Sequence, residues 1–362
     1  LFRSSEIISS NSKTSYNGNY GLNASWTLYN GNKRLKTIQQ EKLNNQVAEL
    51  DVATSENNIQ ESIAQVYIQI LYAAESVKVN ESTLQVSIAQ RDRGQELLNA
   101  GSIAKSDFAQ LEAQVSTDRY QLVTAQATLE DYKLQLKQLL ELDGENEMNI
   151  YLPALSDENV LAPLPTKKDV YIRALSLRPE IEASKLNVEA SELGIGIAKS
   201  SYLPTISLSA GIGTNHTSGS DFTFGEQVKN GWNNSIGLSV SVPIFNNRQT
   251  KSAVQKAKLQ YETSMLSLLD EQKTLYKTIE GLWLDANSAQ QRYAAANEKL
   301  KSTQISYELI SEQFNLGMKN TIELLTEKNN LLQAQQEQLQ AKYMAILNMQ
   351  LLKFYQGDQL AI

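Results

Sequence analysis

Few residues of this chain could carry out covalent or metal chemistry. The sequence contains no cysteine and one histidine, His216, so it can form no disulfide framework, thiol nucleophile or multi-histidine metal site. Residues 194–200 (GIGIAKS) end in a Lys-Ser pair, but they lack the spacing of a phosphate-binding loop and are predicted to be helical. His216 is expected in an exposed loop, and no paired carboxylates or Ser/His/Asp set stands out. We therefore expect a protein without catalysis, cofactor or metal.

The charge pattern argues against nucleic acid as a partner. The 362 residues include 33 Lys+Arg and 40 Asp+Glu, which gives a net charge of −7, and the basic residues are scattered along the chain. Nucleic-acid binding needs basic residues gathered on one face to neutralise phosphates.

No apolar run approaches the roughly 20 residues that a membrane-spanning helix needs.

The positions of proline predict two long helical regions. All six prolines lie between residues 153 and 243, and a proline in a helix interior costs about 3 kcal/mol. In the proline-free stretches on either side, apolar residues recur at alternating steps of three and four, as in a coiled-coil seam. One such seam, which includes Leu111 and Val115, has Asp118 at its next position. We expect 67-residue helices over 33–99 and 249–315, each about 100 Å long.

The chain contains an internal repeat with a constant offset between its two copies. Gly21 aligns with Gly237, and Gly101 aligns with Gly317 without a gap. Each long helix ends near one of the latter two glycines and a shorter helix follows at once, so each repeat should form an antiparallel helical hairpin. The expected boundaries are a strand segment at 1–32, a helical hairpin at 33–142, a linker at 143–168, leading helices at 169–202, a strand hairpin at 203–246 and a second helical hairpin at 247–362.

Segments of alternating pattern precede the long helices. Residues 20–28, 205–213 and 235–244 place large or apolar residues at one parity and mostly small or polar residues at the other, which predicts strands. The polar stretch 214–234 is expected as a loop. The length and pattern match strands of outer-membrane barrels. A soluble sheet packed on a core is the alternative, but the helices are committed to their own seams and leave no second layer to cover it.

The repeat also predicts how many strands the full chain carries. The offset places the partner of strand 205–213 before residue 1, so the chain is expected to lack the start of its first repeat. The full chain would then have four strands, which cannot close a barrel alone. Three copies would supply twelve strands and leave no open sheet edge.

Several stretches of the sequence resemble one family. The resemblance is to the TolC-like outer-membrane efflux proteins. The matching motifs are residues 178–183 (RPEIEA) and 189–209 (EASELGIGIAKSSYLPTISLS), the strand exits at 26–34 and 242–248, and the turns at Gly101 and Gly317. The resemblance covers nearly the whole chain, in the right order and with the repeat. Among the departures are Thr27, where proline is usual, and Lys319, where many members carry arginine.

The resemblance implies an architecture, a function and partners. The expected fold is mainly α with a small β part: long antiparallel coiled-coil hairpins that form the α-barrel of a trimer, and strands of a shared 12-stranded transmembrane β-barrel. The expected function is a passive exit duct in the outer membrane of a Gram-negative bacterium, within a tripartite efflux or type I secretion system. Its partners would be two further copies, a periplasmic adaptor, an inner-membrane pump of RND, ABC or MFS type, and the lipid bilayer.

The resemblance and the strand parity also assign roles to residues. The periplasmic tip, where gating and adaptor contact are expected, would contain Gly101, Lys105, Asp107, Gly317, Lys319 and Glu323. The face expected to line the pore consists of Asn23, Ser25, Thr27, Ser207, Ser209, Ser239 and Ser241. The face expected to meet lipid consists of Leu22, Trp26, Leu28, Ile206, Leu208, Leu238, Val240 and Val242.

Two alternatives remain open at this point. Asp107 and Glu323 are equally well explained as first-turn acids that the helix dipole favours. A non-conducting trimeric coiled-coil scaffold of the cell envelope would use the same hairpins only for reach. The alternating strands favour the channel, because a scaffold has no need of one apolar and one hydroxylated face.

Overall fold

The computed structural model describes residues 16–142, 150–151 and 160–360. The chain divides into two compact units, which are described separately. The sheet unit comprises residues 1–46 and 186–266, and the hairpin unit comprises residues 47–185 and 267–362. The expected start of the first repeat and most of the expected linker at 143–168 lie outside the described residues.

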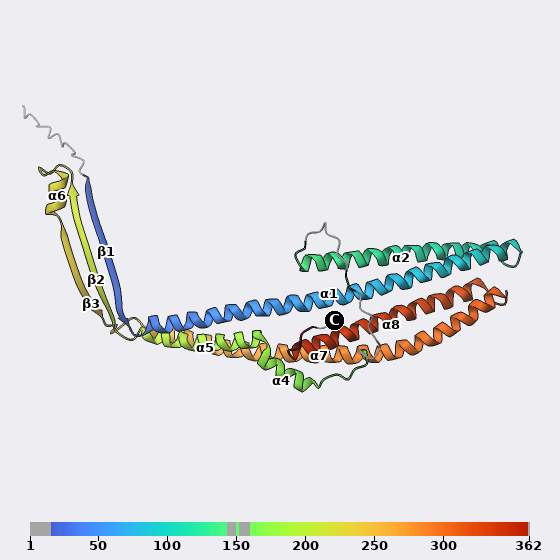
Figure 1. Ribbon diagram of the computed structural model, residues 1–362. Helices are drawn as coiled ribbons and strands as arrows, with labels where there is room; N and C mark the ends of the chain where they lie inside the picture. The colour runs from blue at the N-terminus through green and yellow to red at the C-terminus, as the bar shows by residue number, and fades with distance from the viewer. Residues whose placement is uncertain (1–15, 143–149, 152–159, 361–362) are drawn as a thin grey trace, which may run out of the picture. The chain divides into compact units, whose positions relative to one another are not determined.

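The sheet unit contains three antiparallel strands in the order β1-β2-β3. They span Asn17–Asn30 (β1), Thr205–Thr217 (β2) and Asn233–Ser241 (β3). The short helix α6 (Phe224–Asn230) lies between β2 and β3 in the chain, at the end of the sheet away from the long helices that follow β1 and β3 (Figure 1). Its Thr223 and Glu226 form a reciprocal N-terminal capping box. The expectation of a loop over 214–234 is therefore wrong in two respects, because β2 continues to residue 217 and α6 follows it.

The strand register places like residues on like faces. Trp26 pairs with Leu208, which pairs with Leu238, while Ser25 pairs with Ser209 and then with Gly237. Directly paired residues point to the same side of a sheet. One face is therefore apolar across all three strands and the other is small and polar, as the alternating pattern predicts.

Two of the expected strand positions need correction. The pairing shifts between Thr27 and Tyr29, so Leu28 is the extra residue of a β-bulge and Tyr29 lies opposite Ile206. Strand β3 ends at Ser241, and Val242 lies beyond it. Pro243, which has no N–H for the ladder, accounts for this early end.

The hairpin unit is built from two hairpins of matching dimensions. The helices of the first are α1 (Lys33–Asn99) and α2 (Lys105–Leu139), and those of the second are α7 (Gln249–Asn315) and α8 (Thr321–Tyr355). The predicted 67-residue helices over 33–99 and 249–315 are confirmed. Every bound of the second hairpin is shifted from that of the first by the same offset that aligns Gly101 with Gly317, so the repeat seen in the sequence is also a repeat of structure. Helices α1 and α7 begin within the sheet unit.

Two shorter helices, α4 (Lys167–Leu177) and α5 (Pro179–Ser200), precede the second strand. Proline at the first position of α5 suits a helix start, because the missing N–H has no partner there anyway. Val170 and Ala174 of α4 are buried against α7 and α8, in a cluster that includes Ile279 and Leu352. A second cluster, which includes Ile68 and Tyr293, joins α1, α7 and α8. Helix α8 thus contacts its hairpin partner and the other hairpin (Figure 1).

Candidate functional site: the hairpin turns, the polar contacts between hairpins, and the sheet faces

The two hairpin turns share one backbone geometry. Gly101 and Gly317 have φ of +73° and +74°, in the left-handed region that a helix C-terminus uses to reverse direction and that favours glycine. In the first turn the Ser102 N–H donates to the Leu97 carbonyl, and in the second the Met318 N–H donates to the Gln313 carbonyl, both at 2.8 Å. Each turn therefore closes its long helix in the same way.

The acids Asp107 and Glu323 cap the helices that follow these turns. The Asp107 carboxylate accepts the Ala104 N–H at 3.3 Å, and the Glu323 carboxylate accepts the Asn320 N–H at the same distance. Glu323 also accepts a hydrogen bond from Lys319 at 2.5 Å, within its own turn. These contacts support the helix-start explanation of both acids. A role in gating remains a proposal.

Acidification should loosen the second turn. The hydrogen bonds from Lys319 and the Asn320 backbone lower the pKa of Glu323 below its ordinary value of 4.5. Stabilisation by the ionised carboxylate is therefore present above that value and is lost as the pH falls through the lowered pKa. We expect amide hydrogen exchange at residues 319–324, corrected for intrinsic rates, to accelerate below about pH 4.

Two variants separate this effect from general acid damage. E323Q should exchange faster than wild type at neutral pH and show no further step on acidification. E312Q changes an exposed glutamate of the same hairpin and should behave as wild type. A wild-type turn whose exchange is independent of pH down to 3 would contradict the assignment.

Among the described residues, the predicted tip charges of one turn form no hydrogen bond or ion pair with those of the other turn. Lys105 is exposed and has no hydrogen bond or ion pair in the part of the chain that the structure describes. Arg93 joins the hairpins instead, since its guanidinium donates to the Asn315 carbonyl at 3.3 Å. Behind the turns, Leu111, Phe314 and Leu324 form a buried cluster that includes both hairpins. Near the turns, the two hairpins therefore contact each other through these residues and not through the charged residues predicted at the tip.

A buried ion pair connects the hairpins further from the turns. Lys328 of α8 donates to the Asp118 carboxylate of α2 and to the Ser87 hydroxyl of α1. Lys328 and Asp118 have side chains only 4% and 2% exposed. Gln114 also donates to Asp118, at 2.9 Å, and burial lowers the pKa of Lys328. The sequence shows Asp118 as a polar seam residue, but gives no sign of its partner.

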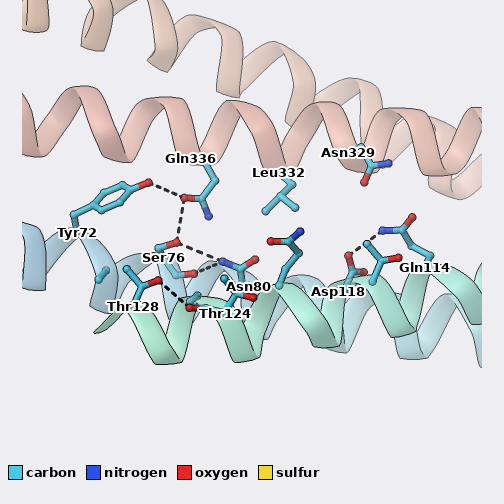
Figure 2. A pocket seen from close by; sticks show the side chains of 14 residues that line it. Tyr72, Ser76, Asn80, Gln114, Asp118, Thr124, Thr128, Asn329, Leu332 and Gln336 are labelled. Carbon is cyan, nitrogen blue, oxygen red and sulfur yellow. Dashed lines mark hydrogen bonds between the residues drawn. The ribbon is translucent and has the colours of Figure 1, made fainter. Parts of the chain in front are cut away.

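A polar cavity of about 400 Å³ lies next to this pair, between α1, α2 and α8 (Figure 2). Gln336 of α8 points at Tyr72 and Ser76 of α1 and accepts hydrogen bonds from them at 3.4 and 3.1 Å. Asn80 donates back to the Ser76 carbonyl at 2.7 Å. Amides and hydroxyls therefore connect the hairpins along this cavity, where a coiled coil would ordinarily have an apolar seam.

Among the residues that the structure describes, none covers either face of the sheet. Trp26, Leu238 and Val240 on the apolar face are 63%, 66% and 58% exposed. The predicted pore-lining residues that pair across the strands, Thr27 with Ser207 and Ser207 with Ser239, lie on the opposite face. His216 is not in a loop as expected; it lies near the end of β2, with its ring 5.0 Å from that of Phe224.

The RPE stretch that contributed to the resemblance forms a buried contact. Arg178, between α4 and α5, donates to Glu180 at 2.8 Å and to Glu61 of α1 at 3.3 Å. Its guanidinium lies 4.4 Å from the ring centre of Tyr355 at the end of α8. Burial raises the pKa of Glu61 and raises that of Tyr355 to about 12. Arg178 therefore contacts residues of three helices, α1, α5 and α8.

Two features are absent among the residues that the structure describes. No group of three or more His, Cys, Asp or Glu side chains among them is arranged to hold a metal ion. Over the same residues, none of the helices has the length and apolar character needed to cross a membrane.

The fold and these sites define a class: a chain of two equivalent long helical hairpins with strands of one apolar and one polar face. The model of the outer membrane efflux protein family matches residues 3–141 and 170–357. The chain therefore belongs to this family, which confirms the resemblance seen in the sequence.

Individual relatives with similar sequences are also outer membrane proteins. The outer membrane efflux protein BepC of Brucella suis is 24% identical over 290 residues, which are 80% of this chain and 60% of that protein. The outer membrane protein TolC of Escherichia coli is 23% identical over 311 residues, 83% of this chain and 62% of that protein. The chain thus spans about three fifths of the length of these relatives.

Solved structures confirm the predicted fold class. The transmembrane channel CusC superposes with a TM-score of 0.81 at 19% identity, over 98% of this chain and 81% of that one. VceC, an outer membrane protein of Vibrio cholerae, superposes with a TM-score of 0.76 at 15% identity, over 96% and 88%.

Proposed function

We propose that this chain is a subunit of a trimeric exit duct in the outer membrane of a Gram-negative bacterium, acting as a passive channel and not as an enzyme. The observation that carries the proposal is the three-stranded sheet of a member of the outer membrane efflux protein family. It is apolar on one face, lined with Ser, Gly and Asn on the other, and uncovered on both. A closed barrel of such strands would meet lipid on one side and water on the other.

The proposed partners follow from the class. A passive channel needs an energy source elsewhere, and we assign that role to an inner-membrane pump of RND, ABC or MFS type that engages the channel through a periplasmic adaptor. Relatives include an efflux protein and the alkaline protease secretion protein AprF of Pseudomonas aeruginosa. A wide, hydroxyl-lined lumen is compatible with small molecules and with proteins, and the choice of pump would select between them.

We place the periplasmic end at the two hairpin turns. Gly101 and Gly317 reverse the helices there, and Lys105, Asp107, Lys319 and Glu323 supply charges on or beside the turns. In this proposal the helical hairpins lie in the periplasm, and the adaptor contacts these turns.

Arginine substitutions on the two sheet faces test the proposal. L238R places a charge on the apolar face, where it should cost about 2–4 kcal/mol near the bilayer midplane and reduce the amount of assembled protein in outer membranes. S209R, on the other face of the neighbouring strand, should assemble normally and change single-channel conductance and ion selectivity in planar bilayers.

The measurement begins with the gene expressed in full length. Particles extracted from outer membranes with mild detergent should have three times the mass of one chain and should conduct. Trimers that never conduct would indicate the envelope scaffold instead. A soluble monomer would contradict both the channel and the membrane location.

A further inference from the structure

The three strands of the sheet end at the same level, on the side where the long helices begin. Asn30 of β1 pairs with Thr205 of β2, and Thr205 pairs with Ser241 of β3. The last turn of α5 precedes β2, and the first turns of α1 and α7 follow β1 and β3, within a few residues of this edge. All of these segments belong to the sheet unit.

Polar contacts hold the three helices side by side next to this edge. The Lys36 ammonium of α1 donates to the Gly196 carbonyl of α5 at 3.4 Å, and Ser191 of α5 forms a hydrogen bond with Ser264 of α7 at 2.8 Å. Figure 1 shows α1 and α5 leaving the sheet together. Side chains from all three helices therefore lie near one another beside the sheet.

This junction contains basic residues and no acidic ones. The segments 31–40, 193–204 and 242–258 together hold eight Lys or Arg and no Asp or Glu, although acids outnumber bases in the whole chain. All of the eight except Lys36 are exposed, and in the part of the chain that the structure describes none of them forms an ion pair. This basic band consists of Lys33, Arg34, Lys36, Lys199, Arg248, Lys251, Lys256 and Lys258.

Neither the strands nor the helix ends explain these charges. None of β1, β2 and β3 has an Asp, Glu, Lys or Arg, and the segment 218–232 at the opposite end of the sheet has two acids and one base. Helices α2, α4, α5, α6 and α8 each have an acid in their first turn, whereas α1 and α7 have none. Because a helix N-terminus favours acids and disfavours bases, local stability does not account for the basic band. Its charges indicate a negatively charged partner outside the chain.

Exposed apolar side chains border the basic band. Ile244 and Phe245, between β3 and α7, are 94% and 84% exposed, and Leu35 and Tyr202 are 58% and 53% exposed. Groups of exposed apolar side chains mark interaction surfaces, and the apolar face of the sheet lies beside this one. A surface that combines apolar and basic side chains is typical of a lipid interface, where apolar groups enter the acyl region and cations reach the phosphates.

The length of the sheet places the basic band at the depth of lipid headgroups. Strand β2 has 13 residues, which span about 30 Å of membrane thickness at about 3.3 Å per residue and a tilt of about 45°. The hydrocarbon core of a bilayer is also about 30 Å thick. A sheet that fills this core therefore positions the residues just beyond its edge among the phosphates of the adjoining leaflet.

We propose that the basic band binds the phosphate groups of anionic phospholipids in the periplasmic leaflet of the outer membrane and thereby fixes the depth of the barrel. The inference rests on the membrane location in the proposed function and deepens it by naming the lipid class and the residues that recognise it. Each cation attracts anionic headgroups over about one Debye length, roughly 8 Å at physiological salt. Zwitterionic lipids carry no net charge and are attracted less.

Fluorescence quenching by brominated lipids measures this preference close to the basic band, because Trp26 lies on the apolar face of β1 near the same edge. Full-length W232F protein, which lacks the exposed tryptophan at the other end of the sheet, is reconstituted in phosphatidylcholine vesicles. The vesicles contain either brominated phosphatidylglycerol or brominated phosphatidylcholine. At equal mole fraction the brominated phosphatidylglycerol should quench Trp26 more strongly, and added salt should reduce the difference. Trp283 lies in the hairpin unit and gives the same background in both.

Substitutions within the basic band test its role directly. K33Q/K199Q/K251Q removes three exposed charges whose side chains form no hydrogen bond with a described residue. It should lower the affinity for phosphatidylglycerol relative to phosphatidylcholine at least about tenfold. K33R/K199R/K251R keeps the charges and should retain the wild-type preference.

A matched control and a change of salt identify the source of the effect. K273Q/K277Q/K301Q removes three exposed lysines many turns further along α7 and should keep the wild-type preference. Replacing chloride by inorganic phosphate at equal ionic strength should also leave the preference unchanged. Loss of the preference in phosphate would mean that the basic band takes a free anion, and would overturn the assignment to lipid.

The outcomes separate this inference from the proposed function. Wild-type trimers that are quenched equally by the two lipids would overturn the inference and leave the channel intact, and so would K33Q/K199Q/K251Q trimers that keep the preference. If that variant forms no trimers, the comparison of the two lipids with wild-type protein decides alone. Protein that does not insert into vesicles of either composition would refute the proposed function first.

Discussion

Replacing Lys328 by methionine should lower the free energy of unfolding by about 3–5 kcal/mol, because it leaves the Asp118 carboxylate buried without a counter-charge. Asp118 is 2% exposed and would retain only Gln114 and Ser87 as donors. Thermal unfolding of the detergent-purified protein, followed by helical circular dichroism, should show the loss. Hydrogen exchange should also rise in α2 and α8, since the pair joins the two hairpins.

A double variant and a surface control make this prediction specific. D118L/K328M removes both charges and should recover most of the lost stability, because well-packed apolar residues commonly replace a buried ion pair at little cost. K353M, at an exposed lysine of the same helix, should change stability by less than about 0.5 kcal/mol. If K328M were as mild as K353M, the buried pair would have no role in holding the hairpins.

The second large effect is expected at Arg178. R178M removes the cation shared by Glu61 and Glu180, whose side chains are 18% and 20% exposed, and leaves two like charges near each other. We expect a loss of about 3–5 kcal/mol. R178K should be intermediate, because an ammonium keeps the charge but loses the planar fork and the stacking on Tyr355.

The pH dependence distinguishes this mechanism from simple loss of packing. Burial raises the pKa of Glu61, and Arg178 opposes that rise. Without Arg178 the pKa of Glu61 should rise further. The protonated carboxyl is then favoured in the folded state, so its stabilisation is full below the ordinary pKa of 4.5 and is lost as the pH rises through the raised value.

R178M should consequently regain part of its stability between pH 7 and pH 5, more than wild type does over the same range. Thermal unfolding at the two pH values measures this directly. R173M, at an exposed arginine of α4, serves as the control and should show the wild-type pH dependence. An R178M defect that is the same at both pH values would mean that lost packing, and not the unpaired carboxylates, explains it.

Local patterns in the sequence were enough to predict the long helices, the repeat and the two-faced strands. Steps of three and four fix which side of a helix is apolar, alternation fixes the two faces of a strand, and prolines mark where helices cannot run. The helix at 224–230 was missed although Thr223 and Glu226 form a recognisable capping box. The bulge at Leu28 depends on pairing between strands and left no local pattern.

The meeting of polar groups between distant segments depends on the three-dimensional packing. Asp118 and Lys328 are 210 residues apart, and Glu61 and Arg178 are 117 apart. A one-dimensional pattern shows that Asp118 lies in a seam, but its partner depends on the axial register between two hairpins. Leu111, Phe314 and Leu324, which pack together behind the turns, are among the contacts made at that register. The ion pairs between distant segments are therefore determined by the packing of the helices against one another, which the sequence pattern does not show.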